Sequence, residues 1–183
     1  AATYIRKAHM GFSSSKPGDT FNKKPEGKKV YPPLPDGVHK FVIIESEYEE
    51  DEKSKRFVMT LQVDDDASDF NRSRVWARFP VESDSYSPVA LRIGQEGMDK
   101  IGFAAGVYEE GDEVPEDYAD RSDLAHKFIG QSVYALTGQR SYNDKIYVDA
   151  KDFWTLEGAH LHDKVMPAEG SKKKAKEVKA PLA

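Results

Sequence analysis

The 183-residue chain contains no cysteine, so neither a disulfide nor a thiolate metal site is available to it. No apolar run approaches the roughly 18 residues that a membrane-spanning helix needs. The first residues also lack the basic-then-apolar pattern of a secretory signal. These absences predict a soluble protein of a reducing compartment, the cytoplasm, or the host cytoplasm if the protein is viral. We expect no membrane partner.

Motifs for catalysis or cofactor binding are also scarce. No serine lies in a nucleophile-elbow pattern, and the glycines within residues 94–102 lack phosphate-loop spacing. The acids at 109–123 lack the spacing of an EF-hand calcium loop. His160 and His162 could hold a metal, but no third ligand follows at a clear spacing, and solvated loop histidines are the simpler interpretation. We therefore expect no enzymatic activity, no cofactor and no metal.

The net charge of −5 is unevenly distributed. Residues 1–40 hold eight Lys or Arg against three acids, and residues 164–183 hold six Lys against two acids. The central residues 41–163 hold 13 basic and 27 acidic side chains, with many of the acids at 109–123. Basic segments attract polyanions and acidic segments repel them. The negative net charge is therefore compatible with a nucleic-acid partner.

Composition divides the chain into three segments. Residues 1–36 are rich in Gly, Ser, Lys and Pro and show no period of 2 or 3.6, which predicts an extended N-terminal arm. Residues 37–160 form the predicted domain, with an acidic insert at 107–123. Residues 161–183 end in a lysine-rich stretch with little apolar surface, which predicts a basic tail.

Apolar residues of the domain mostly alternate with polar ones, as in half-buried strands. Strands are predicted over residues 38–48, 56–63, 74–81, 131–138 and 145–151, the last two forming a hairpin. Ser87 can cap a helix that Pro88 begins, and a helix is predicted over 89–105. Its apolar stripe consists of Ile93, Met98, Ile101 and Ala105. A shorter helix is predicted at 122–128. We predict a mainly β fold, a five-stranded OB-type barrel with one helix between strands three and four.

The third predicted strand places Arg74, Trp76 and Arg78 on one face and Val75 and Ala77 on the other. A strand tryptophan is a core residue about as often as not. Two arginines in register with it favour a surface that binds nucleic acid. A base stacks on the ring, worth roughly 1–3 kcal/mol, while the guanidinium groups neutralise phosphates.

The predicted hairpin adds two rings and two cations. We expect Tyr142 in its loop, and Lys145 and Tyr147 on one strand face opposite Ile146. OB barrels bind single strands on their second and third strands and on the loops that join strands one to two and four to five. The predicted nucleic-acid-binding residues are Lys53, Lys55, Arg56, Arg72, Arg74, Trp76, Arg78, Arg140, Tyr142, Lys145 and Tyr147.

Short motifs between about residues 36 and 152 match a known pattern: Gly37, VIIESE at 42–47, LQV at 61–63, RVW at 74–76, AAG at 104–106 and GQSV at 130–133. They resemble a family of small phage proteins, formerly of unknown function, that are encoded among replication and recombination genes and are thought to bind single-stranded DNA. The resemblance implies an OB fold that coats phage DNA intermediates, and it supplies no catalytic residues.

Sequence-tolerant single-stranded DNA binding is thus the predicted function, with replication or recombination proteins as further partners. The alternative is a protein-interaction module of a replication, recombination or virion assembly, with Trp76 as an interface anchor. The acidic centre favours this alternative. The basic C-terminus differs from the acidic tails that recruit replication enzymes in many bacterial and phage single-strand binders; residues 109–123 could replace such a tail. The sequence is compatible with a homo-oligomer and does not determine the oligomeric state.

Overall fold

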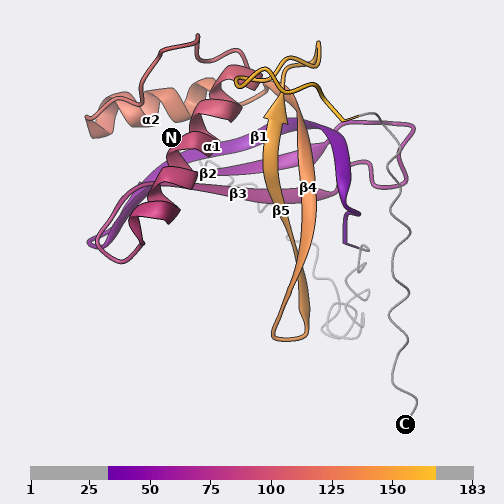
Figure 1. Ribbon diagram of the computed structural model, residues 1–183, viewed down its shortest axis with the longest axis horizontal. Coiled ribbons are helices and arrows are strands. Elements are labelled where there is room, and N and C mark those ends of the chain that lie inside the picture. Colours follow the sequence, from indigo (N-terminus) through magenta and orange to yellow (C-terminus); the bar gives the residue numbers. More distant parts are fainter. Residues whose placement is uncertain (1–32, 168–183) are drawn as a thin grey trace, which may run out of the picture. The chain divides into compact units, whose positions relative to one another are not determined.

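A computed structural model describes residues 33–167 of the protein. Most of the predicted arm and of the predicted tail, residues 1–32 and 168–183, lies outside the described residues. The strands are β1 (Gly37–Glu50), β2 (Ser54–Val63), β3 (Arg74–Ser83), β4 (Ser132–Tyr142) and β5 (Lys145–Trp154), and the helices are α1 (Pro88–Ala104) and α2 (Tyr118–Lys127) (Figure 1). Neither α1 nor α2 is long and apolar enough to cross a membrane.

The strands form one antiparallel sheet in the order β3-β2-β1-β4-β5. The long strand β1 pairs with two neighbours. Its first part pairs with β4 and its remainder pairs with β2, with a bulge between Ile43 and Glu45. The outer strands β3 and β5 approach each other, and the rings of Phe79 and Phe153 lie 5.9 Å apart. No backbone ladder joins these two strands in the described part of the chain. The mainly β prediction is confirmed, and the sheet is open.

The core is formed by buried side chains of the five strands and of the two helices that pack against them. The predicted alternation of β2 is confirmed, since Phe57, Met59, Leu61 and Val63 are all buried. Helix α1 packs against β3 and β5, while α2 packs against β1. Figure 1 shows both helices on one side of the molecule, away from the tip of the β4–β5 hairpin.

Helix α1 begins as predicted, but its buried face differs from the prediction. The Ser87 hydroxyl accepts a hydrogen bond from the Ala90 N–H at 3.2 Å, as an N-cap does. Met98 and Ile101 are buried, whereas Ile93 is 60% exposed. The neighbouring Gly94 faces the sheet instead, because a Cβ there would lie 2.3 Å from the backbone oxygen of Pro80. The missing side chain brings α1 close to β3.

The acidic insert is partly helical. Helix α2 starts at Tyr118, four residues before the predicted start, with Asp117 at the N-cap position and Asp120 in the first turn. Acidic side chains at a helix N-terminus are favoured by the exposed backbone N–H groups and the helix dipole. Two helices therefore separate β3 from β4, where the predicted fold class named one.

The β4–β5 hairpin is longer than predicted. Only Asn143 and Asp144 form its turn, and both have positive φ values, 49° and 58°. Two left-handed residues are what a type I′ turn requires, and Asn and Asp tolerate this conformation. Tyr142 is therefore the last residue of β4 and not a loop residue, which corrects the prediction. Residues 139–147 are all exposed, and Figure 1 shows the hairpin end extending beyond the rest of the sheet.

The end of the predicted arm packs against the domain. Leu34 is buried in the core, and the Gln139 side chain donates a hydrogen bond to its backbone oxygen at 2.9 Å. The Gln139 N–H in turn donates to the Asp36 carboxylate at 2.6 Å. Residues 33–36 thus lie along β4, and the domain begins before residue 37.

Candidate nucleic-acid interface

The outer face of β3 carries the predicted ring and cations. Val75 and Ala77 are buried, while Arg74, Trp76 and Arg78 point outward, and Trp76 is 60% exposed. The alternation predicted for this strand is confirmed. An indole with this much surface in water contributes little to the core, and its exposed part is available to a ligand.

Strand β2 supplies a neutral row beside the β3 side chains. Trp76 lies opposite Thr60, and Arg78 lies opposite Val58. The Arg74 Nε donates a weak hydrogen bond to the Gln62 side-chain oxygen across the strands at 3.4 Å. Within residues 33–167 neither Arg74 nor Arg78 forms an ion pair. Both guanidinium groups are therefore free to receive an anion.

Strand β1 adds a row of acids on the other side of β2. Glu45 lies opposite Thr60, and Glu47 lies opposite Val58. Two interstrand spacings, about 10 Å, separate this row from β3. That distance is close to the Debye length at physiological salt, so a phosphate at β3 is repelled only partly. Sequence reasoning missed this row, although the alternation of acids at 45, 47 and 49 is visible in the sequence.

The cations predicted at the β1–β2 turn are mostly paired. The Arg56 Nε donates to the Glu49 carboxylate at 2.9 Å, and the Lys55 ammonium lies 2.8 Å from Glu82. The hydrogen bond to Glu82 raises the pKa of Lys55. Lys53 is exposed and forms no ion pair in the described chain. Surface pairs of this kind stabilise a fold only weakly, so a phosphate can compete for either cation.

The hairpin gathers its predicted residues on one face. Arg140 lies opposite Tyr147, and Tyr142 lies opposite Lys145, so all four side chains share one side of the hairpin. The Arg140 guanidinium lies 5.0 Å from the centre of the Tyr147 ring and also pairs with Asp149. Tyr142 is 62% exposed at the end of the hairpin. The hairpin therefore presents two accessible rings.

The predicted residues thus fall into three groups: the β1–β2 turn, the β3 face and the hairpin face. Arg72 lies near the end of the β2–β3 connection, next to the β3 group, with a φ of 68° and an exposed side chain. Strands β3 and β5 lie at opposite ends of the strand order but approach each other, and the end of the β4–β5 hairpin extends beyond the rest of the sheet (Figure 1). Two surfaces, the β3 face and the hairpin face, therefore combine exposed rings with cations.

In sequence comparisons the chain matches no protein-family model and no curated protein. What the two surfaces bind is therefore inferred from their own geometry and charge.

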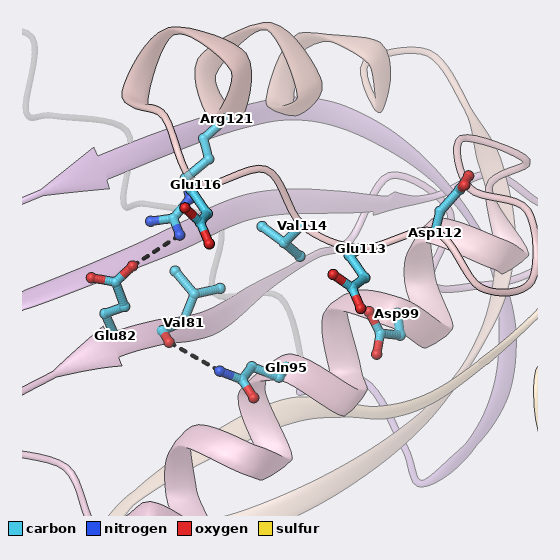
Figure 2. A pocket seen from close by; sticks show the side chains of 9 residues that line it. All are labelled: Val81, Glu82, Gln95, Asp99, Asp112, Glu113, Val114, Glu116 and Arg121. Atoms are coloured by element: carbon cyan, nitrogen blue, oxygen red, sulfur yellow. Dashed lines mark hydrogen bonds and ion pairs between the residues drawn. The ribbon is translucent and has the colours of Figure 1, made fainter.

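A third surface feature is anionic. A cavity of about 480 Å³ lies between β3, α1 and the segment that leads into α2 (Figure 2). Arg121 is the one cation that lines it, against Glu82, Asp99, Asp112, Glu113 and Glu116. Burial raises the pKa of Asp99. A cavity with this charge repels phosphate, so it does not belong to the nucleic-acid interface.

Arg121 is the structural link of this region. Its guanidinium donates to the Glu82 carboxylate at 2.9 Å (Figure 2). It also donates to the Tyr48 hydroxyl at 2.7 Å, so Arg121 ties α2 to β3 and β1. Hydrogen bonds from Lys55 and Arg121 hold the pKa of Glu82 below its usual value. The single cation of the cavity is thus already engaged.

His160 is a buried structural residue and not the solvated loop histidine that the sequence suggested. It is 4% exposed, and its Nε2 lies 2.6 Å from the Asp152 carboxylate. The His162 backbone N–H donates to the His160 Nδ1, so Nε2 carries the proton and donates to Asp152. Lys100 also contacts Asp152, at 3.4 Å. In the described residues no group of three His, Cys, Asp or Glu is arranged to hold a metal.

The acidic partner of this histidine is stabilised in its charged form. Burial alone would raise the pKa of Asp152, but the hydrogen bond from His160 and the charge of Lys100 hold it below the usual value. The contact fastens the segment after β5 to the domain. It accounts for the burial of the His160 side chain.

Proposed function

We propose that the protein is a non-enzymatic, sequence-tolerant single-stranded DNA-binding protein that acts in phage DNA replication or recombination. The observation that carries the proposal is the β3 triplet, an exposed Trp76 between Arg74 and Arg78. A base stacks on the indole. The guanidinium groups on either side neutralise phosphates, which releases counterions from the DNA. Neither contact depends on base identity, so binding tolerates any sequence.

The strand order supports an OB-type fold for this function. In that fold a single strand of nucleic acid binds across the second and third strands. Here Trp76 lies on the third strand, and the neutral Thr60 and Gln62 lie beside it on the second. The helix α1 between β3 and β4 packs where β3 and β5 approach each other, as expected for a partly open barrel of this type.

The distribution of charge supports a path for the bound strand along β2 and β3, away from β1 and α2. The Glu45 and Glu47 row disfavours phosphates on the β1 side of the face. The acidic cavity near α2 disfavours them there as well. The exposed hairpin rings, Tyr142 and Tyr147, offer further stacking positions. A DNA duplex keeps its bases stacked inside, so the exposed rings favour single strands over duplex.

The proposal is tested by the affinity for a labelled oligo-dT, measured by fluorescence anisotropy at fixed salt. We expect Trp76→Ala to weaken binding by about 5- to 150-fold, the equivalent of 1–3 kcal/mol. The matched control is Tyr86→Ala, since Tyr86 is an exposed aromatic in the connection between β3 and α1. That variant should bind like the natural protein. Unchanged affinity in a folded Trp76→Ala variant contradicts the proposal.

The same titration separates the alternative function. If the natural protein binds no oligonucleotide even at low salt but forms a stoichiometric complex with another protein, Trp76 is a protein-interaction anchor. The Trp76→Ala variant would then lose that protein partner instead.

A further inference from the structure

Within residues 33–167, the outer edge of strand β5 is unpaired. In this part of the chain β5 is the last strand in the order, and its one pairing partner is β4. A bulge separates the pairs Leu136–Asp152 and Thr137–Ala150, which leaves Lys151 without an opposite residue. The regular edge therefore runs from Lys145 to Ala150, in the exposed part of the hairpin. Such an edge is a template for another strand.

The turn geometry decides which backbone groups are free. A two-residue turn is flanked by a hydrogen-bonded pair, here Tyr142 and Lys145, and hydrogen-bonded pairs then alternate along the hairpin. Lys145, Tyr147 and Asp149 thus direct their backbone groups toward β4. Ile146 and Val148 direct theirs outward. Apart from contacts to β4, no backbone hydrogen bond involves this segment in residues 33–167.

The side chains along this edge are complementary to those of a second copy of the same edge. When two copies of residues 145–149 run antiparallel about a two-fold axis at Tyr147, Lys145 lies opposite Asp149 of the second copy. Ile146 then lies opposite Val148 of the second copy. Lys145 forms no ion pair within the described chain, and Ile146 is 54% exposed. Pairing would supply each with a suitable neighbour.

We propose that two copies of the chain associate by antiparallel pairing of their β5 edges, centred on Tyr147. The outward backbone groups of Ile146 and Val148 then exchange four hydrogen bonds between the copies. A four-stranded sheet of two hairpins results. Because the two-fold axis is perpendicular to this sheet, the faces that carry Arg140, Tyr142 and Tyr147 lie on the same side in both copies.

The size of the edge sets the strength of the association. Stable interfaces bury about 1,200–2,000 Å² in total, and five paired residues bury much less. The dimer is therefore weak, and we expect its dissociation constant to be micromolar or higher. Since two Lys–Asp pairs contribute, it weakens further as salt is added.

Covalent trapping tests the register directly. The natural chain has no cysteine, so Tyr147→Cys introduces the only thiol. In the proposed dimer the two Cα atoms at this position form a non-hydrogen-bonded pair about 4.5 Å apart, within the range of a disulfide. Mild oxidation should give a covalent dimer. Ser141→Cys, exposed on the inner strand β4, is the control and should stay monomeric. Absence of the Tyr147→Cys dimer, or equal cross-linking of both variants, overturns the proposal.

Charge reversal tests the pairing without a covalent bond. In sedimentation velocity up to several hundred micromolar, Lys145→Glu alone and Asp149→Lys alone should each dimerise at least tenfold more weakly than the natural chain, because like charges then meet. A mixture of the two variants should form a heterodimer, since each reversed charge meets its opposite.

Three results contradict the proposal: a natural chain that stays monomeric at every concentration, a dimer insensitive to both reversals, or a mixture that does not associate. Coverage of the β5 edge by residues 1–32 of the same chain gives the first result. No DNA is present in these measurements, so their outcome is independent of the proposed DNA binding.

Discussion

The Thr60 hydroxyl donates a hydrogen bond to the Glu45 carboxylate, with 2.8 Å between Oγ1 and Oε2. Thr60 also lies directly opposite Trp76 on the neighbouring strand. One neutral side chain therefore separates the exposed ring on β3 from a carboxylate on β1. The outer face of the sheet is divided lengthwise into a cationic, aromatic strand and an acidic strand.

Removal of the Glu45 charge should strengthen DNA binding. Glu45→Gln keeps an oxygen that can accept the Thr60 hydrogen bond but no longer repels a phosphate about 10 Å away. At an effective dielectric constant between those of protein surface and water, we expect roughly 2- to 4-fold tighter binding of oligo-dT. Glu110→Gln, in the acidic segment before α2, should leave the affinity unchanged. Weaker binding by Glu45→Gln would show that DNA does not lie beside β2.

The two arginines of β3 should determine part of the salt dependence. Each phosphate neutralised on a single strand contributes about 0.7 to the slope of log affinity against log salt. Arg74→Ala with Arg78→Ala should thus reduce the magnitude of the slope by about 1.4. Arg92→Ala, which removes an exposed cation of α1 that pairs with Glu96, should leave the slope unchanged. If the β3 double variant and Arg92→Ala reduced the salt slope equally, the β3 arginines would have no special role in DNA binding.

Local alternation made much of the fold predictable. Each of the five predicted strands is present, and the inward and outward sides of β2 and β3 are as expected, because a period of two assigns each residue to a face. The helix start at Ser87 was predictable because the cap and proline act within one turn. The β3 triplet, the centre of the candidate interface, was predictable for the same reason, because strand alternation places Arg74, Trp76 and Arg78 on one face.

Features that depend on distant contacts were not predictable. Ile93 is exposed because Gly94 meets Pro80, which no helical pattern reveals. His160 is buried because its Nε2–H donates a hydrogen bond to the Asp152 carboxylate on β5. The ion pairs of Lys55 and Arg140 likewise require knowledge of which strands lie side by side.

The close approach of α1 and β3 predicts an unusual effect of alanine. In an exposed helix, Gly→Ala stabilises by about 1 kcal/mol. At Gly94 the added methyl group meets the Pro80 backbone, so we expect Gly94→Ala to destabilise the fold by roughly 1–3 kcal/mol in urea unfolding. Ile93→Ala, one residue earlier, should change stability by less than about 0.5 kcal/mol. If Ile93→Ala were more destabilising than Gly94→Ala, the close contact between α1 and β3 at Gly94 would be contradicted.

The Asp152–His160 contact predicts a pH-dependent contribution to stability. The pKa of Asp152 is lowered in the folded state, so its contribution is complete above the ordinary value of 3.8 and is lost as the pH falls through the folded-state value. Asp152→Asn should be less stable than the natural protein near neutral pH. The difference should shrink on acidification below 3.8, as measured by denaturant unfolding across pH. A difference independent of pH would mean that the charge of Asp152 is irrelevant.

The central claim is that a base stacks on Trp76, and tryptophan fluorescence during titration with oligo-dT tests it most directly. The chain has only two tryptophans, and Trp154 is buried beside His160, so a quenched signal reports on Trp76. We predict strong quenching in the natural protein at low salt, a shift of the midpoint to higher DNA concentration at high salt, and loss of the quenching in Trp76→Phe. Binding without any change in fluorescence, or equal quenching in Trp76→Phe, would contradict the account.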